Sequence, residues 1–68
     1  MAIVKIRELI GVSETSFEDA LKNIVDHEIK NGKNVTGAKV ISQSVTVENG
    51  KCKEYKVNAK LAYLWEEK

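Results

Sequence analysis

Apolar and polar residues alternate strictly over the last part of the chain. Every second position there is apolar, namely Tyr55, Val57, Ala59, Leu61, Tyr63 and Trp65. A period of two places all six side chains on one face of a β-strand, so we predict a strand over Lys51–Trp65. Ala62 and Leu64 also make the opposite face apolar near the end of this strand.

A chain of 68 residues with one short helix cannot cover so much apolar strand surface by itself. Disulfides cannot supply the missing stability, because Cys52 is the only cysteine. We therefore expect the protein to complete its core with copies of itself. The residues expected at the interface between copies are Tyr55, Leu61, Tyr63 and Trp65.

The first half of the chain predicts one strand followed by one helix. Alternation over Ile3–Ile10 predicts the strand, and Gly11 is expected to end it in a turn. Ser13 is the expected helix cap, and Thr15 with Glu18 matches a capping box. The helix that follows has one stripe at i, i+3, i+4 spacing, formed by Phe17, Ala20, Leu21, Ile24, Val25 and Glu28.

Glycines mark the ends of the remaining elements. Gly32 is expected to stop the helix, and a second strand is predicted over Thr36–Glu48. Asn49-Gly50 then predicts a tight hairpin, because both residues accept the positive φ of a type I′ turn. The predicted fold is α+β in β-α-β-β order. A three-stranded antiparallel sheet packs on one helix in a single domain over residues 1–68.

Charge and composition exclude several classes of function. Eleven basic and ten acidic residues give a net charge of +1, so no strong field favours nucleic acid or a membrane surface. The chain has no set of nucleophile, base and orienting residue, so an enzyme is not predicted. Cys52 and His27 cannot form a zinc site by themselves. We expect a cytoplasmic protein.

Three motifs in the right order resemble the dodecin family. They are Ile-Gly-Val-Ser-x-x-Ser-Phe-x-x-Ala at residues 10–20, Ala-Lys-Val-Ile-x-Gln at 38–43 and Tyr-Lys-Val-x-x-Lys-x-Ala-Tyr at 55–63. The resemblance implies a hollow homododecamer with its helices outward and its sheets lining the interior. It also implies storage or sequestration of a flavin, such as FMN, FAD or riboflavin.

The chain departs from the flavin-binding dodecins at two positions. Gly37 stands where the resemblance implies a tryptophan that stacks on the flavin, and Lys56 stands where it implies a glutamine. Glycine has no ring to stack, and lysine cannot accept a hydrogen bond as an amide does. Two hypotheses follow: a shell that holds flavin in an altered geometry, or a non-flavin dodecamer that holds divalent cations or an anionic cofactor.

Other residues are candidates for these ligands. Lys39, Lys56 and Lys60 can attract an anion if the sheet faces inward, and their alternative role is that of solvated strand residues. Gln43, with Ser42 and Ser44, marks either the polar wall of a cavity or a bulge. Glu14, with Glu18 and Asp19, can bind a divalent cation at a subunit junction, although helix capping explains the same acidic cluster.

Overall fold

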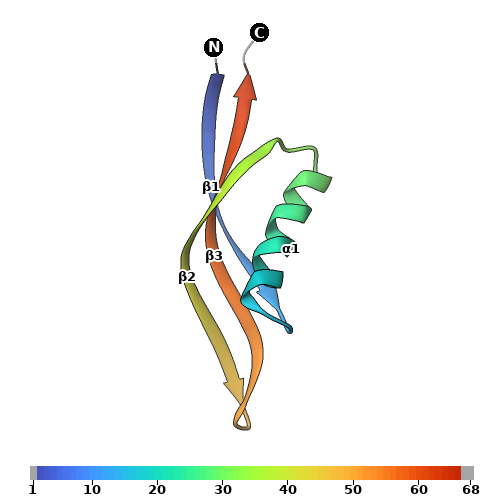
Figure 1. Ribbon diagram of the computed structural model, residues 1–68, viewed down its shortest axis with the longest axis vertical. Helices are drawn as coiled ribbons and strands as arrows, with labels where there is room; N and C mark the ends of the chain where they lie inside the picture. The colour runs from blue at the N-terminus through green and yellow to red at the C-terminus, as the bar shows by residue number, and fades with distance from the viewer. Residues whose placement is uncertain (1, 67–68) are drawn as a thin grey trace.

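A three-stranded antiparallel sheet carries one helix on one of its faces. The computed structural model of the chain describes residues 2–66. Its elements are β1 (Ala2–Ser13), α1 (Phe17–Lys30), β2 (Val35–Glu48) and β3 (Lys51–Glu66), as Figure 1 shows. The strand order is β1-β3-β2, so β3 lies in the centre. The predicted α+β fold with β-α-β-β order is confirmed.

The molecule is long and thin, and its core lies between α1 and the middle of the sheet. Its extents are 54 × 21 × 12 Å. The beginning of β1 and the end of β3 lie together at one end, and the β2–β3 hairpin forms the other end (Figure 1). Among residues 3–65, the buried apolar side chains of the core come from α1 and β3: Ala20, Ile24, Val57, Ala59 and Leu61.

Strand β1 continues through Gly11, contrary to the turn predicted there. Gly11 is buried and pairs with Val57 of β3. A Cβ atom at Gly11 would lie only 2.4 Å from the carbonyl oxygen of Ala20, so the glycine allows α1 to pack directly on the strand. The strand ends at Ser13, two residues later.

The helix is capped by Ser16, which corrects the cap predicted at Ser13 and the capping box of Thr15 with Glu18. The Ser16 side chain accepts a hydrogen bond of 3.0 Å from the backbone N–H of Asp19. Ser13 instead organises the turn before the helix, because its hydroxyl accepts from the Thr15 N–H and donates to the Asp19 carboxylate.

The predicted turns at the other element ends are confirmed. Gly32 follows the helix with a φ of 80°, and Asn49 and Gly50 have φ values of 53° and 74°. These last two positive angles are those of a type I′ hairpin turn. Within residues 2–66, no helix has the length and apolar character needed to cross a membrane.

Candidate functional site

The sheet leaves one whole face without a helix, and we call this the open face. Val57, Ala59 and Leu61 of β3 are buried toward α1, so the alternate residues of β3 and their register partners lie on the opposite side. On β1 this places Val4, Ile6 and Ile10 on the open face, and all three are exposed. The open face is therefore apolar along β1, whereas the sequence pattern placed the surplus of apolar surface on the Tyr55–Trp65 face of β3.

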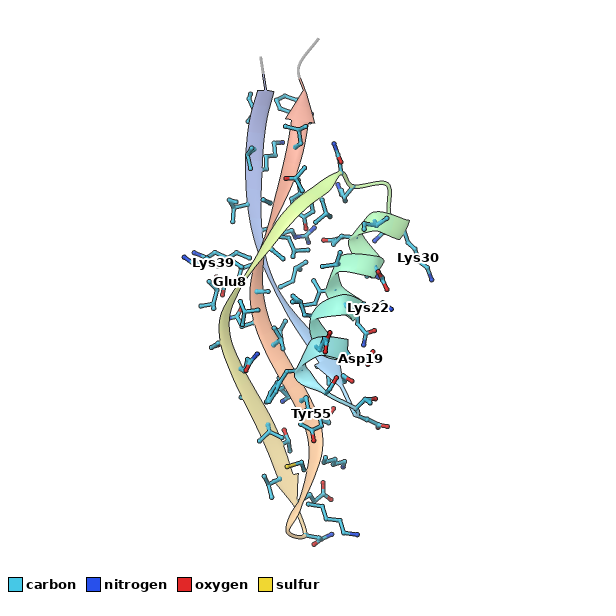
Figure 2. All side chains as sticks on the ribbon, viewed as in Figure 1. Glu8, Asp19, Lys22, Lys30, Lys39 and Tyr55 are labelled. Atoms are coloured by element: carbon cyan, nitrogen blue, oxygen red, sulfur yellow. The ribbon has the colours of Figure 1, made fainter. Side chains whose placement is uncertain are left out.

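A polar row crosses the middle of the open face. Lys60 of β3 lies between Glu8 of β1 and Lys39 of β2 in the strand register. Asn58, the neighbour of Lys60 on this face, donates a hydrogen bond of 3.0 Å to the Glu8 carboxylate. Glu8 and Lys39 project away from α1 in Figure 2. Two lysines directly opposite each other repel, and an anion between them would relieve the repulsion.

Asn58 also leaves an acceptor unused on this face. Its side-chain oxygen is buried and has no hydrogen-bond partner among the described residues. A buried acceptor without a donor is costly, so a donor from outside the single chain would stabilise this position. The unused oxygen lies within one strand position of Lys60 and of the polar row.

Gly37 and Lys56 both belong to the open face, but they lie far apart along it. Gly37 pairs with Ala62, whereas Lys56 pairs with Ser44 and Val12. Six residues of β3 separate the two levels, which corresponds to roughly 20 Å. A ligand that touches both positions at short range would therefore need residues from more than one copy of the chain.

Gln43 lies on the other face from Lys39 and Lys56. A register shift between Val40 and Ser42 puts an extra residue, Ile41, into β2. After this bulge Gln43 pairs with Val57, whose side chain faces α1. The structure therefore does not bring Gln43 together with the two lysines, and simple alternation could not locate the bulge.

Three of the four predicted interface residues pack within their own chain. Leu61 is fully buried beneath α1, so the prediction that it contacts other copies is corrected. The Tyr55 ring packs edge-on against Phe17 with centroids 5.1 Å apart. The reason is that this face of β3 is the one that α1 covers. Trp65 lies beyond the helix and is 45% exposed, so it remains a candidate for contact between copies.

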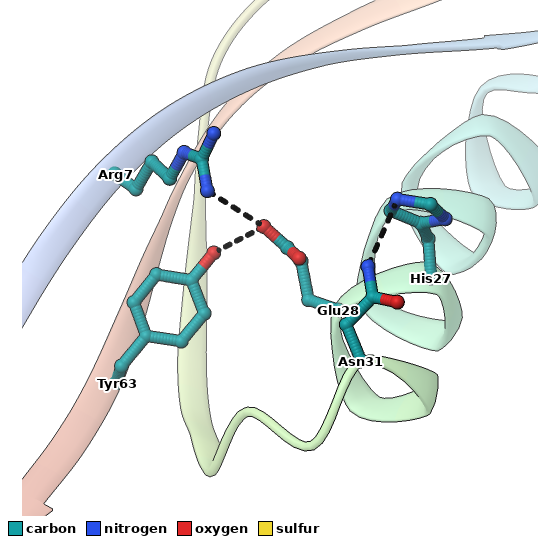
Figure 3. A network of polar contacts seen from close by, with 5 residues as sticks. All are labelled: Arg7, His27, Glu28, Asn31 and Tyr63. Carbon is teal, nitrogen blue, oxygen red and sulfur yellow. Dashed lines mark hydrogen bonds and ion pairs between the residues drawn. The ribbon is translucent and has the colours of Figure 1, made fainter.

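Tyr63 contributes to a buried polar network that the sequence did not predict. Its hydroxyl donates a hydrogen bond of 2.9 Å to Glu28, which is only 4% exposed, and Arg7 lies 3.7 Å from the same oxygen (Figure 3). Burial raises the pKa of Tyr63 above its ordinary value of 10.0, and the hydrogen bond to Glu28 adds to the rise. The network ties β1 and β3 to the end of α1.

The acidic helix start serves the fold of the single chain. The Asp19 carboxylate accepts a hydrogen bond of 2.7 Å from Ser13, and its backbone N–H is capped by Ser16. Within residues 2–66, no three His, Cys, Asp or Glu side chains come together in a group able to hold a metal ion. A cation site at Glu14 would need ligands from another copy.

Comparison with known proteins decides the family. The dodecin family model matches residues 3–66. The chain belongs to the dodecin family. Dodecins bind flavins as their general role and assemble into homododecamers. The family resemblance of the three sequence motifs is thus confirmed.

Solved dodecin structures have the same fold. The dodecin of Streptomyces coelicolor matches with a TM-score of 0.91 and 21% identity, over 98% of this chain and 96% of that one. A variant of the Thermus thermophilus dodecin matches with a TM-score of 0.91 and 25% identity, over 98% of this chain and all of that one. Among curated proteins, no sequence matches this chain.

A dodecin that binds a metal is also similar to this chain. It is the calcium dodecin of Mycobacterium tuberculosis, described as a calcium-chelating antigen with a novel calcium-binding site. Its TM-score is 0.74 at 26% identity, over 97% of this chain and 91% of that one.

Proposed function

We propose that this dodecin forms a homododecameric shell that stores a small anionic ligand on its inner wall, and that the open face of the sheet is this wall. The observation that carries the proposal is the polar row on the open face. There, Lys39 and Lys60 lie opposite each other, and the one acidic side chain of the row, Glu8, lies on the other side of Lys60 and accepts a hydrogen bond from Asn58. An enclosed wall of this kind would repeat the pair of lysines in every copy.

The ligand we favour is a flavin that carries phosphate, such as FMN, rather than a neutral flavin. Gly37 offers no ring for stacking, so the contact that would hold the isoalloxazine of any flavin is absent at that position. The lysines of the polar row remain, and a lysine binds phosphate through charge-assisted hydrogen bonds. Binding should therefore depend on the phosphate group more than on the ring.

Parallel titrations of FMN and riboflavin, followed by flavin fluorescence, test this proposal. We expect FMN to bind at least about tenfold more tightly than riboflavin, since a hydrogen bond to a charged group contributes about 1.5–3 kcal/mol. Lys60→Gln should remove the preference. Lys22→Gln removes the same charge from the exposed side of α1 and should keep it (Figure 2).

A second pair of variants tests the role assigned to Gly37. A Cβ atom added at Gly37 would have the Ala62 side chain as its nearest neighbour, at 4.0 Å, so the position has room for a larger residue. Gly37→Trp should bring riboflavin binding, whereas Gly37→Leu, which adds bulk without a ring system, should not. Wild-type protein that binds riboflavin as tightly as FMN would contradict the proposal.

A further inference from the structure

A groove lies on the helix side of the sheet, at the end of the molecule where the two termini meet. We call it the terminal groove; it is lined by Lys5, Arg7, Lys33, Tyr63 and Trp65. Its volume is about 550 Å³, which is within the range of small-molecule sites. Its strand residues with charged or aromatic side chains belong to the face opposite the polar row, because Lys5 pairs with Tyr63 and Arg7 pairs with the buried Leu61. Ile6 and Leu64, which belong to the open face, also border the groove.

The terminal groove is strongly cationic. Lys5, Arg7 and Lys33 line it, and the buried Glu28 forms an ion pair with only one of these three cations, Arg7, at 3.7 Å. The Arg7 side chain is 63% exposed, so most of its donors point to solvent. Among the side chains of residues 3–65, no carboxylate lies within ion-pair distance of Lys5 or Lys33. Since Lys5 lies over the Trp65 ring and Arg7 faces Glu28, an anion would meet Lys33 and the remaining donors of Arg7.

The groove also contains an exposed aromatic platform. Trp65 is 45% exposed, and the Lys5 ammonium lies 4.6 Å from the centre of its ring. Tyr63 forms the adjacent wall, with its hydroxyl already donated to Glu28. A planar ring can stack on the part of the indole that Lys5 does not cover, while its charged substituent reaches the cations around it.

We propose that the terminal groove binds a phosphate-bearing molecule with a planar ring, of the nucleotide class. The ring lies against Trp65, and the phosphates are held by Lys33 and Arg7. This site is separate from the inner wall proposed above, since the two use opposite faces of the sheet. The competing occupant is an acidic segment of a neighbouring copy of the chain, such as the turn that carries Glu14.

Trp65 makes the proposal directly measurable, because it is the only tryptophan of the chain. We would titrate the assembled protein with ADP and follow tryptophan fluorescence, with equilibrium dialysis of ADP as an independent measure. The expected result is saturable quenching by ADP, with adenosine and pyrophosphate each binding about tenfold more weakly or worse. Pyrophosphate that binds as tightly as ADP would overturn the assignment of a ring to the ligand.

Three lysine variants distinguish binding in the terminal groove from binding on the open face. Lys33→Gln should raise the dissociation constant of ADP about tenfold and leave the mass of the assembly unchanged. Lys22→Gln, on the helix surface, and Lys60→Gln, in the polar row, should leave ADP binding as in the wild type. ADP binding lost in Lys60→Gln but kept in Lys33→Gln would place the nucleotide on the open face and overturn this proposal alone.

The assembled protein can also fail to bind ADP at all. No binding by either dialysis or fluorescence would overturn the proposal. If Lys33→Gln then changed the mass of the assembly, the acidic segment of a neighbouring copy would be the occupant of the groove. In either case, the comparison of FMN with riboflavin tests the polar row at Lys60, and its result is independent of the result for the terminal groove.

Discussion

At the scale of single residues, Gly11 and Tyr63 fix how the helix sits on the sheet. Gly11 gives α1 the space to lie directly on β1, since an added Cβ atom would meet Ala20 and Ile24 at 2.4 Å. Tyr63 satisfies the buried carboxylate of Glu28 at the other end of the helix. A side chain at position 11, or loss of the Tyr63 hydroxyl, should each weaken the packing of α1 on the sheet.

Gly11→Ala should destabilise the protein by about 1–3 kcal/mol, because a backbone carbonyl cannot move away as the end of a side chain can. Urea unfolding at a fixed protein concentration measures the change. Gly37→Ala is the matched control, with its nearest neighbour at 4.0 Å, and should change the free energy of unfolding by less than about 0.5 kcal/mol. Equal effects of both variants would contradict the close packing at Gly11.

Tyr63→Phe should make the protein less stable at neutral pH by about 1–3 kcal/mol, because Glu28 loses its hydrogen-bond donor while it stays buried. This advantage of the wild type should shrink at alkaline pH. The pKa of Tyr63 is raised by folding, so above pH 10.0 the unfolded chain releases this proton first and wild-type stability falls as the pH rises.

Unfolding in urea between about pH 8 and pH 11 tests this pH dependence. The difference in stability between the wild type and Tyr63→Phe should be constant below about pH 10 and then decrease. Tyr55→Phe serves as the control, because the Tyr55 hydroxyl makes no hydrogen bond to a described residue while its ring packs on Phe17. A difference that stays constant up to about pH 11 would count against a raised pKa for Tyr63.

At the scale of elements, the alternation and turn patterns predicted all four elements and their order. The predictions that differ from the structure concern local features within or next to these elements. Gly11 was placed in a turn because glycine is common in turns, whereas here close packing of α1 requires it. The sequence leaves open whether Ser42, Gln43 and Ser44 mark a cavity wall or a bulge; the structure has a bulge at Ile41, which places Gln43 on the face of α1.

The candidate site was less predictable than the fold, for two physical reasons. First, alternation groups side chains by face but does not say which face a helix covers, and this is why Leu61 was expected at an interface. Second, the groove at Lys5 and Lys33 joins residues from β1 and from the loop after α1, which only the tertiary structure brings together.

The start of α1 provides a prediction at this scale. Ser16→Ala should lower the free energy of unfolding by about 1 kcal/mol, because the Asp19 N–H loses its capping partner. Thr15→Ala is the informative control, since the sequence alone made Thr15 a capping residue, and it should change stability by less than about 0.5 kcal/mol. Urea unfolding of both variants decides between the caps, and a larger effect at Thr15 would contradict the structure.

At the scale of the whole molecule, the open face exposes several large apolar side chains of β1. Ile6 is 60% exposed there, beside Val4 and near Ile10, in a protein of only 68 residues. Exposed patches of this kind usually mark contacts between proteins. The family forms homododecamers, and a shell of that kind would enclose this face.

We expect the apolar β1 end of the open face to contact a neighbouring copy, while the polar row faces the interior. Ile6→Lys should therefore break or shrink the assembly, because the added charge would recur at every equivalent contact. Size-exclusion chromatography with light scattering measures the result. Ile29→Lys introduces the same change on α1, where the isoleucine is 52% exposed, and should leave the assembly intact. Loss of assembly in both variants would mean that the open face has no special role.

Native mass spectrometry of the wild-type protein shows whether the open face is enclosed in a shell. We expect a species of twelve times the 7.6 kDa chain mass. A stable monomer or dimer at micromolar concentration would contradict the proposed shell, since the open face would then remain exposed and could not form an inner wall.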